Sequence, residues 1–375
     1  MTRDEKFMRE AIRLACKGHG HTRPNPAVGC VIVKDGRIIG RGWHRRAGAP
    51  HAEIEALRSL KNSRAALGAT LYVTLEPCST RGRTGPCTEA LIAAGVARVV
   101  AGAIDPNPKH RGRGLRILRK AGLALTSGVL DKECAALNPE FNHFMSTGRP
   151  WVVAKCGMSL DGRLSRPPGE SQWITSKAAR ADAMKLRARV DAMLVGANTV
   201  RTDDPALTVR GIRGAAQPWR VIWAPRGRPP AKSKVFKDRW RHKTIVATNQ
   251  TLKGVLRDLA KRGIQSVLVE GGGHTLGQLF KESLADEVTF YIAPLLAGGP
   301  IPAVGSRPAK VPQIVSAHWE KIGQCLKVRG IVQKQRKQSA KNFPFCEKNP
   351  CRVLNVCTTL ASRNNSVTQT NLKPS

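Results

Sequence analysis

The stretch between residues 50 and 87 decides how the first half of this chain is interpreted: it contains Pro-His-Ala-Glu at 50–53, Glu-Pro-Cys at 76–78 and Pro-Cys at 86–87. His51, Cys78 and Cys87 are three protein ligands for a tetrahedral metal whose fourth position stays open, as in catalytic zinc sites. Glu53 is the type of residue that moves protons for a water molecule at such a metal. The stretch therefore predicts one Zn2+ site, with Glu53 as its catalytic residue.

Helix geometry limits where His51 can lie. Residues two apart on a regular helix point to nearly opposite sides, so His51 and Glu53 can serve one metal only if His51 precedes the first regular turn. Pro50 favours that position, because proline prefers the start of a helix. Cys87 follows a proline at the head of another expected helix, where the helix dipole favours a thiolate. A single His-x-Glu occurs often by chance, but the whole combination is rare and matches the zinc-deaminase signature.

Alternating helix and strand patterns surround this stretch. Short apolar runs predict strands, and apolar residues recurring every 3.6 positions predict helices. The expected strands are 30–34, 37–42, 70–75 and 97–103, and the expected helices are 4–18, a helix from about 51, 88–94 and 112–121. Residues 138–144 are expected to close the domain. This order predicts an α/β domain over residues 1–146 with a largely parallel sheet flanked by helices, and a linker at 146–150.

A second α/β pattern begins at Trp151 and predicts a second domain over residues 150–333. Its expected strands are 151–155, 192–196, 220–223, 244–248, 266–270 and 287–292, and its expected helices are 176–188, 252–262 and 274–282. Residues 334–375 are polar, so we expect a disordered tail. Its three cysteines match no zinc-finger spacing.

Charge is the dominant feature of the composition. The 375 residues include 63 Lys and Arg against 26 Asp and Glu, a formal net charge of +37. Such a charge is typical of a nucleic-acid binder or of a protein with phosphorylated ligands. We find no aromatic-interleaved RNA-binding motif. The N-terminus lacks the apolar core of a signal peptide, no apolar run is long enough to span a bilayer, and the ten cysteines show no disulfide framework. We therefore expect a cytoplasmic protein that does not associate with a membrane.

The spacing of the two cysteines narrows the interpretation further. Eight residues separate them in Cys78-Ser-Thr-Arg-Gly-Arg-Thr-Gly-Pro-Cys87, whereas the usual nucleobase-editing deaminases have two. With Pro-Asn-Pro-Ala-Val-Gly at 24–29, Gly-Trp-His at 42–44 and Asp-Pro-Asn-Pro at 105–108, roughly residues 1–331 resemble the bifunctional riboflavin-biosynthesis deaminase/reductase (RibD) family. The resemblance implies a three-layer cytidine-deaminase-like domain, then a dihydrofolate-reductase-like α/β domain. It also implies that Asn25 and His44 line the deaminase pocket; a turn residue and an exposed histidine are the alternative interpretations.

The second half shows a weaker signal of its own. A strand at 266–270 runs into Gly271-Gly272-Gly273-His274 and a helix, which is typical of a phosphate cradle, although a leucine occupies the third glycine position of the dinucleotide fingerprint. Resemblance to the reductase domain implies contacts with NADPH at Gly157, Trp173, Thr199, Asp203, Gly272, Gly273, His274, Thr275, Leu276, Gly277 and Gln278. It implies substrate contacts at Ser171, Arg187, Leu207, Arg210 and Glu270. Taken singly, Asp203, Trp173 and Arg187 are better explained by a turn, by core packing and by a solvated helix face. Taken together with their spacing, these residues favour the functional interpretation.

The function implied by the resemblance has two steps. The first is zinc-dependent deamination of 2,5-diamino-6-(5-phosphoribosylamino)pyrimidin-4(3H)-one. The second is NADPH-dependent reduction of the ribosyl chain to give 5-amino-6-(5-phosphoribitylamino)uracil. The expected partner is this small phosphoribosyl pyrimidine rather than a specific nucleic acid, and a homodimer is compatible with it.

Two rival hypotheses remain at this point. One is a tRNA deaminase with an accessory RNA-binding domain, and the other is a catalytically silent, zinc-stabilised RNA-binding protein. The sequence after Ile331-Val332 supplies no obvious final strand, which puts the completeness of the second sheet in doubt.

Overall fold

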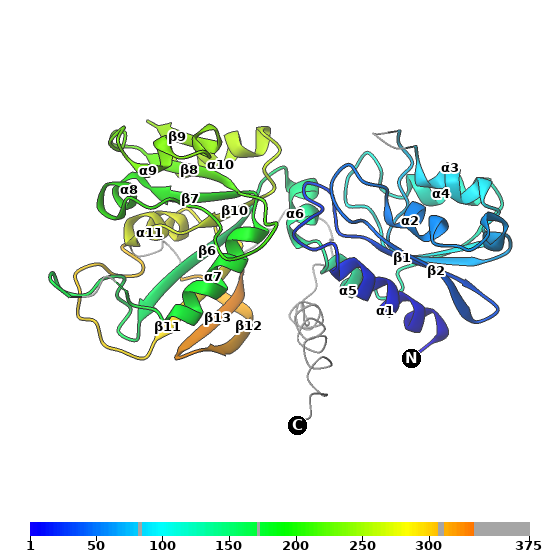
Figure 1. The fold of residues 1–375 in the computed structure, drawn as a ribbon, viewed down its shortest axis with the longest axis horizontal. Coiled ribbons are helices and arrows are strands. Elements are labelled where there is room, and N and C mark those ends of the chain that lie inside the picture. The colour runs from blue at the N-terminus through cyan, green and yellow to red at the C-terminus, as the bar shows by residue number, and fades with distance from the viewer. Residues whose placement is uncertain (82–84, 171–172, 307–310, 334–375) are drawn as a thin grey trace, which may run out of the picture. The chain divides into compact units, whose positions relative to one another are not determined.

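A computed structural model describes residues 1–81, 85–170, 173–306 and 311–333. The described residues form two compact units, one over Met1–Ser146 and one that begins at Thr147 (Figure 1). Among them, no helix combines the length and the hydrophobicity needed to cross a membrane.

The first unit is built on a five-stranded sheet in the order β2-β1-β3-β4-β5. β1 is antiparallel to both β2 and β3, whereas β3, β4 and β5 are parallel. The strands are β1 (Gly29–Lys34), β2 (Arg37–Trp43), β3 (Thr70–Leu75), β4 (Arg98–Ala103) and β5 (Ala124–Ser127). The helices are α1 (Arg3–Cys16), α2 (Ala52–Arg58), α3 (Cys87–Ala93), α4 (Arg113–Lys120), α5 (Asp131–Ala135) and α6 (Pro139–Thr147), with a short 3-10 helix at Ser63–Ala66.

Helices cover both faces of this sheet because successive strand residues point to opposite sides. Val31 and Val33 of β1 pack in the cluster that contains α1 and α5. Cys30 and Ile32, from the same strand, pack in the cluster that contains α2, α3 and α4. The resulting three-layer arrangement is that of a cytidine-deaminase-like domain. α1 begins at Arg3, one residue earlier than expected, because Thr2 and Glu5 form a reciprocal capping box.

The second unit contains an eight-stranded sheet in the order β12-β13-β11-β6-β10-β7-β8-β9. The six strands from β11 to β9 are parallel, and β13 and β12 add an antiparallel edge. The strands are β6 (Trp151–Ser159), β7 (Ala192–Gly196), β8 (Trp219–Ala224), β9 (Thr244–Thr248), β10 (Ser266–Val269), β11 (Glu287–Ala293), β12 (Gln313–Ile322) and β13 (Cys325–Gln333). The helices are α7 (Lys177–Arg189), α8 (Ala197–Asp203), α9 (Lys234–Lys237), α10 (Leu252–Lys261) and α11 (Gly273–Lys281), with a 3-10 turn at Arg241–Lys243.

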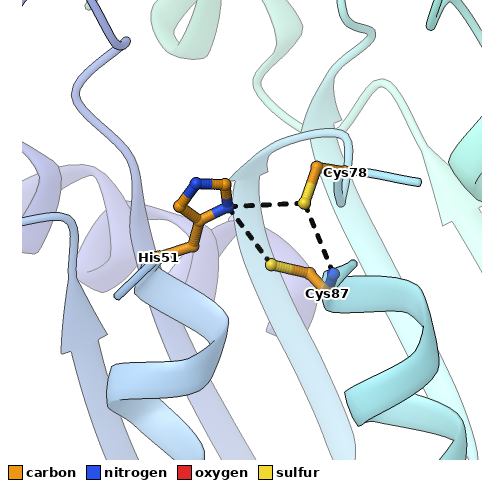
Figure 2. Close-up of side chains that lie close together, drawn as sticks. All are labelled: His51, Cys78 and Cys87. Atoms are coloured by element: carbon orange, nitrogen blue, oxygen red, sulfur yellow. Dashed lines mark hydrogen bonds between the residues drawn. The ribbon is translucent and has the colours of Figure 1, made fainter. Parts of the chain in front are cut away.

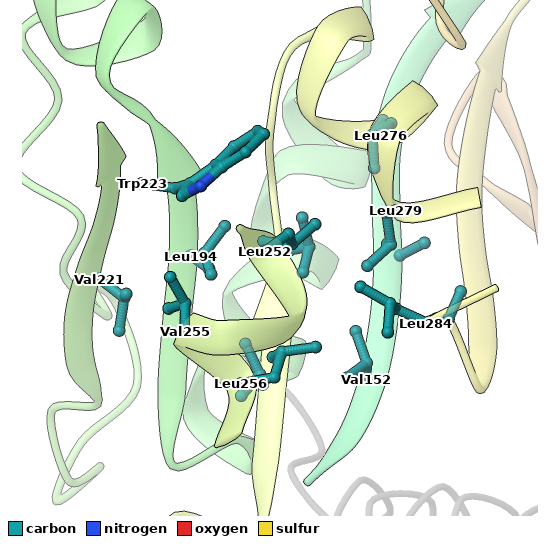
Figure 3. Packing of buried hydrophobic residues seen from close by; sticks show 14 of the residues in the cluster. Val152, Leu194, Val221, Trp223, Leu252, Val255, Leu256, Leu276, Leu279 and Leu284 are labelled. Atoms are coloured by element: carbon teal, nitrogen blue, oxygen red, sulfur yellow. The ribbon is translucent and has the colours of Figure 1, made fainter. Parts of the chain in front are cut away.

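The largest core of the second unit lies between this sheet and helices α10 and α11 (Figure 3). Val152, Leu194 and Val221 from neighbouring parallel strands meet Leu256 of α10 and Leu279 of α11 there. The strand residues that alternate with these, such as Val153 and Met193, pack in a separate cluster on the opposite face. Burial on both faces explains why these strands read as continuous apolar runs in the sequence.

Three expectations about the elements need correction. The final strands do not fall after Ile331-Val332: β12 and β13 end at Gln333, so the eight-stranded sheet is complete within the described residues. The supposed linker at 146–150 begins inside α6, where the Ser146 hydroxyl donates to the carbonyls of Asn142 and His143. Four short elements, α5, β5, α8 and α9, were not expected at all. The expected disorder of 334–375 lies outside the described residues.

Candidate functional site

The three predicted metal ligands come together at the starts of two helices (Figure 2). His51 is the residue immediately before α2, and its extended backbone (φ −70°, ψ 164°) places it ahead of the first regular turn. Cys87 is the first residue of α3, and Cys78 lies in the loop that follows β3. The Nδ1 atom of His51 is 3.4 Å from Cys78 Sγ and 3.3 Å from Cys87 Sγ.

This donor set fits zinc. Zn–S bonds of about 2.3 Å and Zn–N bonds of about 2.0 Å in a tetrahedron separate nitrogen and sulfur by about 3.5 Å, close to the observed distances. The backbone N–H of Cys87 donates to Cys78 Sγ at 3.3 Å, as it would to a thiolate. Hydrogen bonds from Cys87 and His51 lower the pKa of Cys78 to about 4, so this sulfur is poised to bind a cation.

Glu53 lies in the first turn of α2, next to this triad. It is 3% exposed, and burial, together with the negative charge of Cys78, raises its pKa to about 7. A carboxyl group with such a pKa can both accept and release a proton near neutral pH, as a general acid-base catalyst must. The arrangement can therefore hold a metal and move protons beside it.

Asn25 and His44 join the same site. The Asn25 amide nitrogen is 3.2 Å from His44 Nε2, and His44 Nδ1 is 3.0 Å from the Pro50 carbonyl. The carbonyl can only accept, so Nδ1 carries the proton and Nε2 accepts from Asn25. Burial lowers the pKa of His44, consistent with a neutral ring, and this ring packs edge-on against His51 at 5.4 Å. His44 is buried rather than the exposed histidine of the alternative interpretation.

In the second unit, Arg187 of α7 and Glu270 at the carboxyl end of β10 bind each other. Arg187 Nε and Nη2 donate to the two carboxylate oxygens at 2.8 and 2.7 Å. A third arginine nitrogen donates to the Thr208 carbonyl at 3.2 Å. Lys155 Nζ lies 3.8 Å from the same carboxylate, and no role was predicted for this lysine. In the sequence, Lys155 stands out only as a charged residue that directly follows the apolar run 151–154 of an expected strand.

Burial alone would raise the pKa of Glu270, but Lys155 and Arg187 lower it to about 2. A carboxyl group whose pKa is lower in the folded state adds stability above its ordinary pKa, near 4.5, and loses it as the pH falls toward 2. We expect the second unit to lose about 2 kcal/mol of this contribution between pH 7 and pH 3. Urea unfolding at both pH values measures it, and Glu270→Gln should show a smaller pH-dependent loss. An equal loss in both proteins would contradict the assignment.

Only some of the residues predicted to contact NADPH lie close to one another in the second unit. The start of α8 lies beside the start of α11: a Cβ atom at Gly196, the residue before α8, would lie 2.7 Å from Thr275 Oγ1. Thr199 lies in the first turn of α8, whereas Asp203 is the last residue of that helix. Gly272 precedes α11, and the remaining predicted residues of that run lie inside the helix. The Leu276 side chain is fully buried in the core (Figure 3), which explains the missing third glycine. His274 is exposed and stacks on Trp223 at 5.9 Å.

The remaining predicted residues differ in environment. A Cβ atom at Gly157 would lie 2.8 Å from the Thr175 side chain, so this glycine permits close packing. Trp173 is 53% exposed, with the Arg180 guanidinium 4.4 Å from its ring. Leu207 is buried with a left-handed backbone (φ 49°), directly before the Thr208 carbonyl that Arg187 binds. The Gln278 amide donates to the Glu282 carboxylate, and the Arg210 side chain is exposed. Ser171 lies outside the described residues.

Comparison with known proteins matches both units. Residues 1–103 match the family described as the cytidine and deoxycytidylate deaminase zinc-binding region, and residues 150–328 match the RibD C-terminal domain. The chain is 44% identical over 327 residues to riboflavin biosynthesis protein RibD of Escherichia coli, covering 79% of this chain and 89% of that protein. It is 42% identical over 316 residues to its Aquifex aeolicus counterpart, covering 79% and 88%.

Solved structures agree with these matches. Acinetobacter baumannii RibD superimposes with a TM-score of 0.81 at 39% identity, covering 88% of this chain and 99% of that one. A Thermotoga maritima protein described as a diaminohydroxyphosphoribosylaminopyrimidine deaminase/5-amino-6-(5-phosphoribosylamino)uracil reductase superimposes with a TM-score of 0.79 at 35% identity, with the same coverage.

Proposed function

Because this chain belongs to the RibD family of riboflavin-biosynthesis proteins, we propose that it is a bifunctional enzyme that deaminates and then reduces a phosphoribosyl pyrimidine. The first unit, residues 1–146, removes the 2-amino group of 2,5-diamino-6-(5-phosphoribosylamino)pyrimidin-4(3H)-one. The second unit, residues 150–333, reduces the ribosyl chain to give 5-amino-6-(5-phosphoribitylamino)uracil. The observation that carries the proposal is the convergence of His51, Cys78 and Cys87 beside the buried carboxyl group of Glu53.

In the deaminase, His51, Cys78 and Cys87 would hold Zn2+, which would supply the Lewis acidity that makes water reactive at neutral pH. Glu53 takes a proton from the attacking water and delivers it to the pyrimidine ring, then to the departing amino group. The balance is one water consumed and one ammonia released. Asn25 and His44 form a wall of the pocket, and the fixed ring of His44 holds the Pro50 carbonyl next to the ligand His51.

In the reductase, bound NADPH would supply the hydride for the reduction at C1 of the opened ribose, and the one proton that the reduction also consumes would come from solvent. The helix start at Gly272 and Gly273, with Thr199 and Asp203 of α8, forms its binding edge at the carboxyl ends of the parallel strands. Glu270 accepts hydrogen bonds from the sugar hydroxyls, while Arg187 and Lys155 keep that carboxylate ionised. The exposed guanidinium of Arg210 suits the substrate phosphate.

We further propose that the enzyme works in the cytoplasm on this small molecule and needs no specific nucleic-acid partner. The long loop between Cys78 and Cys87 and the presence of a complete reductase sheet both support a free pyrimidine over a base in a polynucleotide. The net charge of +37 is the one observation that favours RNA. A direct comparison of the two substrates therefore decides between them.

The test supplies the diamino-pyrimidinone ribosyl phosphate and follows ammonia by a colorimetric assay and NADPH by absorbance. We expect equal amounts of ammonia released and NADPH oxidised. After zinc is removed with a chelator, ammonia release should stop, while NADPH oxidation should continue when the deaminated intermediate is supplied. Ammonia release from tRNA but not from the pyrimidine would support the RNA-deaminase rival. Bound zinc with neither activity would support a silent binding protein.

A further inference from the structure

Glu76 is a buried carboxylate that binds backbone N–H groups. It directly follows the last residue of β3 and is 5% exposed. Its Oε2 accepts from the N–H groups of Asp105 and Gly112 at 3.2 and 2.8 Å. Its Oε1 accepts from the N–H of Gly114 at 2.8 Å. Within the described part of the chain it forms no salt bridge, and the hydrogen-bond partners of its carboxylate are these three backbone N–H groups.

The groups that Glu76 binds belong to the start of α4 and the loop before it. The first N–H groups of a helix lack partners within the helix, and the helix dipole favours a negative charge there. α4 has no side-chain cap of its own, because the residue before it is Gly112. Glu76 therefore anchors the end of β3 to a helix start that is 36 residues away in the sequence.

This anchor lies two residues before the metal ligand Cys78. The backbone of the intervening Pro77 lies so close to α4 that a Cβ atom at Gly114 would be 2.1 Å from the Pro77 carbonyl oxygen. On its other side, the Cys78 carbonyl accepts from the N–H of Thr88, the residue after the ligand Cys87. The backbone around Cys78 is thus held between α4 and α3.

We propose that Glu76 is a positioning residue of the metal centre: by fixing the Pro77–Cys78 backbone against α4, it sets the Cys78 sulfur relative to His51 and Cys87. This inference rests on the zinc site of the proposed function. Glu76 itself is not one of the three grouped ligands His51, Cys78 and Cys87. Partners of this outer kind commonly change metal affinity by about 10–100-fold when they are replaced.

The test compares zinc affinity in Glu76→Gln and the unchanged protein by competition with a chromophoric chelator. Glutamine keeps the shape but replaces one accepting oxygen with an NH2 group, which cannot accept from a backbone N–H. We expect affinity per folded molecule to fall about 10–100-fold. We also expect the thiolate-to-cobalt absorption of the Co2+-substituted protein to shift. Glu287→Gln is the matched control, because Glu287 is a buried glutamate of the second unit that pairs with Arg329, and zinc affinity should not change.

Each outcome bears on a definite claim. Unchanged affinity and an unchanged cobalt spectrum in Glu76→Gln would overturn the inference, even if the variant were less stable. If Glu76→Gln does not fold, Gly114→Ala replaces it, since this change keeps the carboxylate but displaces Pro77, and the same loss of affinity is expected. Failure of the unchanged protein to bind zinc would instead refute the proposed metal site itself.

Discussion

Glu53→Gln should lower the rate of ammonia release by about 10²–10⁴-fold, the usual contribution of a general acid-base residue. The glutamine side chain fills the same buried space but cannot carry a proton between water and the leaving amino group. The three ligand atoms lie on His51, Cys78 and Cys87, so the variant should still bind one zinc. Steady-state ammonia release and metal content by mass spectrometry measure the two effects separately.

The second unit provides the control for this variant. NADPH oxidation with the deaminated intermediate should be the same in Glu53→Gln and in the unchanged protein, because residues 1–146 and the described residues between 147 and 333 form separate compact units. Near-full ammonia release by the variant would refute the role of Glu53. Loss of zinc together with activity would show that Glu53 supports the metal site rather than the proton transfer.

Arg187→Met should abolish NADPH oxidation and destabilise the second unit by about 3–5 kcal/mol, the usual result of breaking a buried ion pair from one side. Methionine leaves the buried Glu270 carboxylate with Lys155, at 3.8 Å, as its remaining cationic partner among the described residues. It also removes the hydrogen bond to the Thr208 carbonyl. Six of the seven tryptophans lie after residue 150, so urea unfolding followed by tryptophan fluorescence reports mainly on this unit.

Lys261→Met is the matched control. Lys261 pairs with Asp258 at 3.7 Å in the same unit, but its side chain is 74% exposed, and exposed pairs contribute less than about 1 kcal/mol. This variant should leave the tryptophan transition and NADPH oxidation unchanged. A similar loss of stability in both variants would mean that the Arg187–Glu270 pair stabilises the protein no more than an exposed pair does. Full NADPH oxidation by Arg187→Met would exclude Arg187 from the reductase site.

The elements predicted correctly have strong local patterns. β7 and β9 were expected with their observed bounds because each is a short apolar run between turn residues. β12 was missed because nearly all of its residues are at least partly exposed, so the alternation that identifies a half-buried strand is lost. α8 was missed because a seven-residue helix is too short to show a period.

The two candidate sites differ in how far the sequence could predict them. Metal chemistry accepts few residue types, so His51, Cys78 and Cys87 could be selected as ligands before their positions were known. The pairing of Arg187 with Glu270 joins residues 83 positions apart, and no local pattern indicates it. Glu76 belongs to the Glu-Pro-Cys motif, but its proposed role depends on backbone N–H groups. Every residue except proline has such a group, so the sequence does not indicate which of them bind Glu76.

The edge strand β12 of the second sheet affects how readily the protein aggregates in concentrated solution. Regular edge strands offer a row of unpaired N–H and C=O groups to which another chain can add, and this leads to aggregation. In β12 the register shifts between Val315 and His318, and Ser316 adopts a left-handed backbone (φ 52°). Such an irregularity interrupts the row, so a strand from another molecule could pair with only part of this edge. The sheet thereby ends in a strand that is a poor template for fibrous growth.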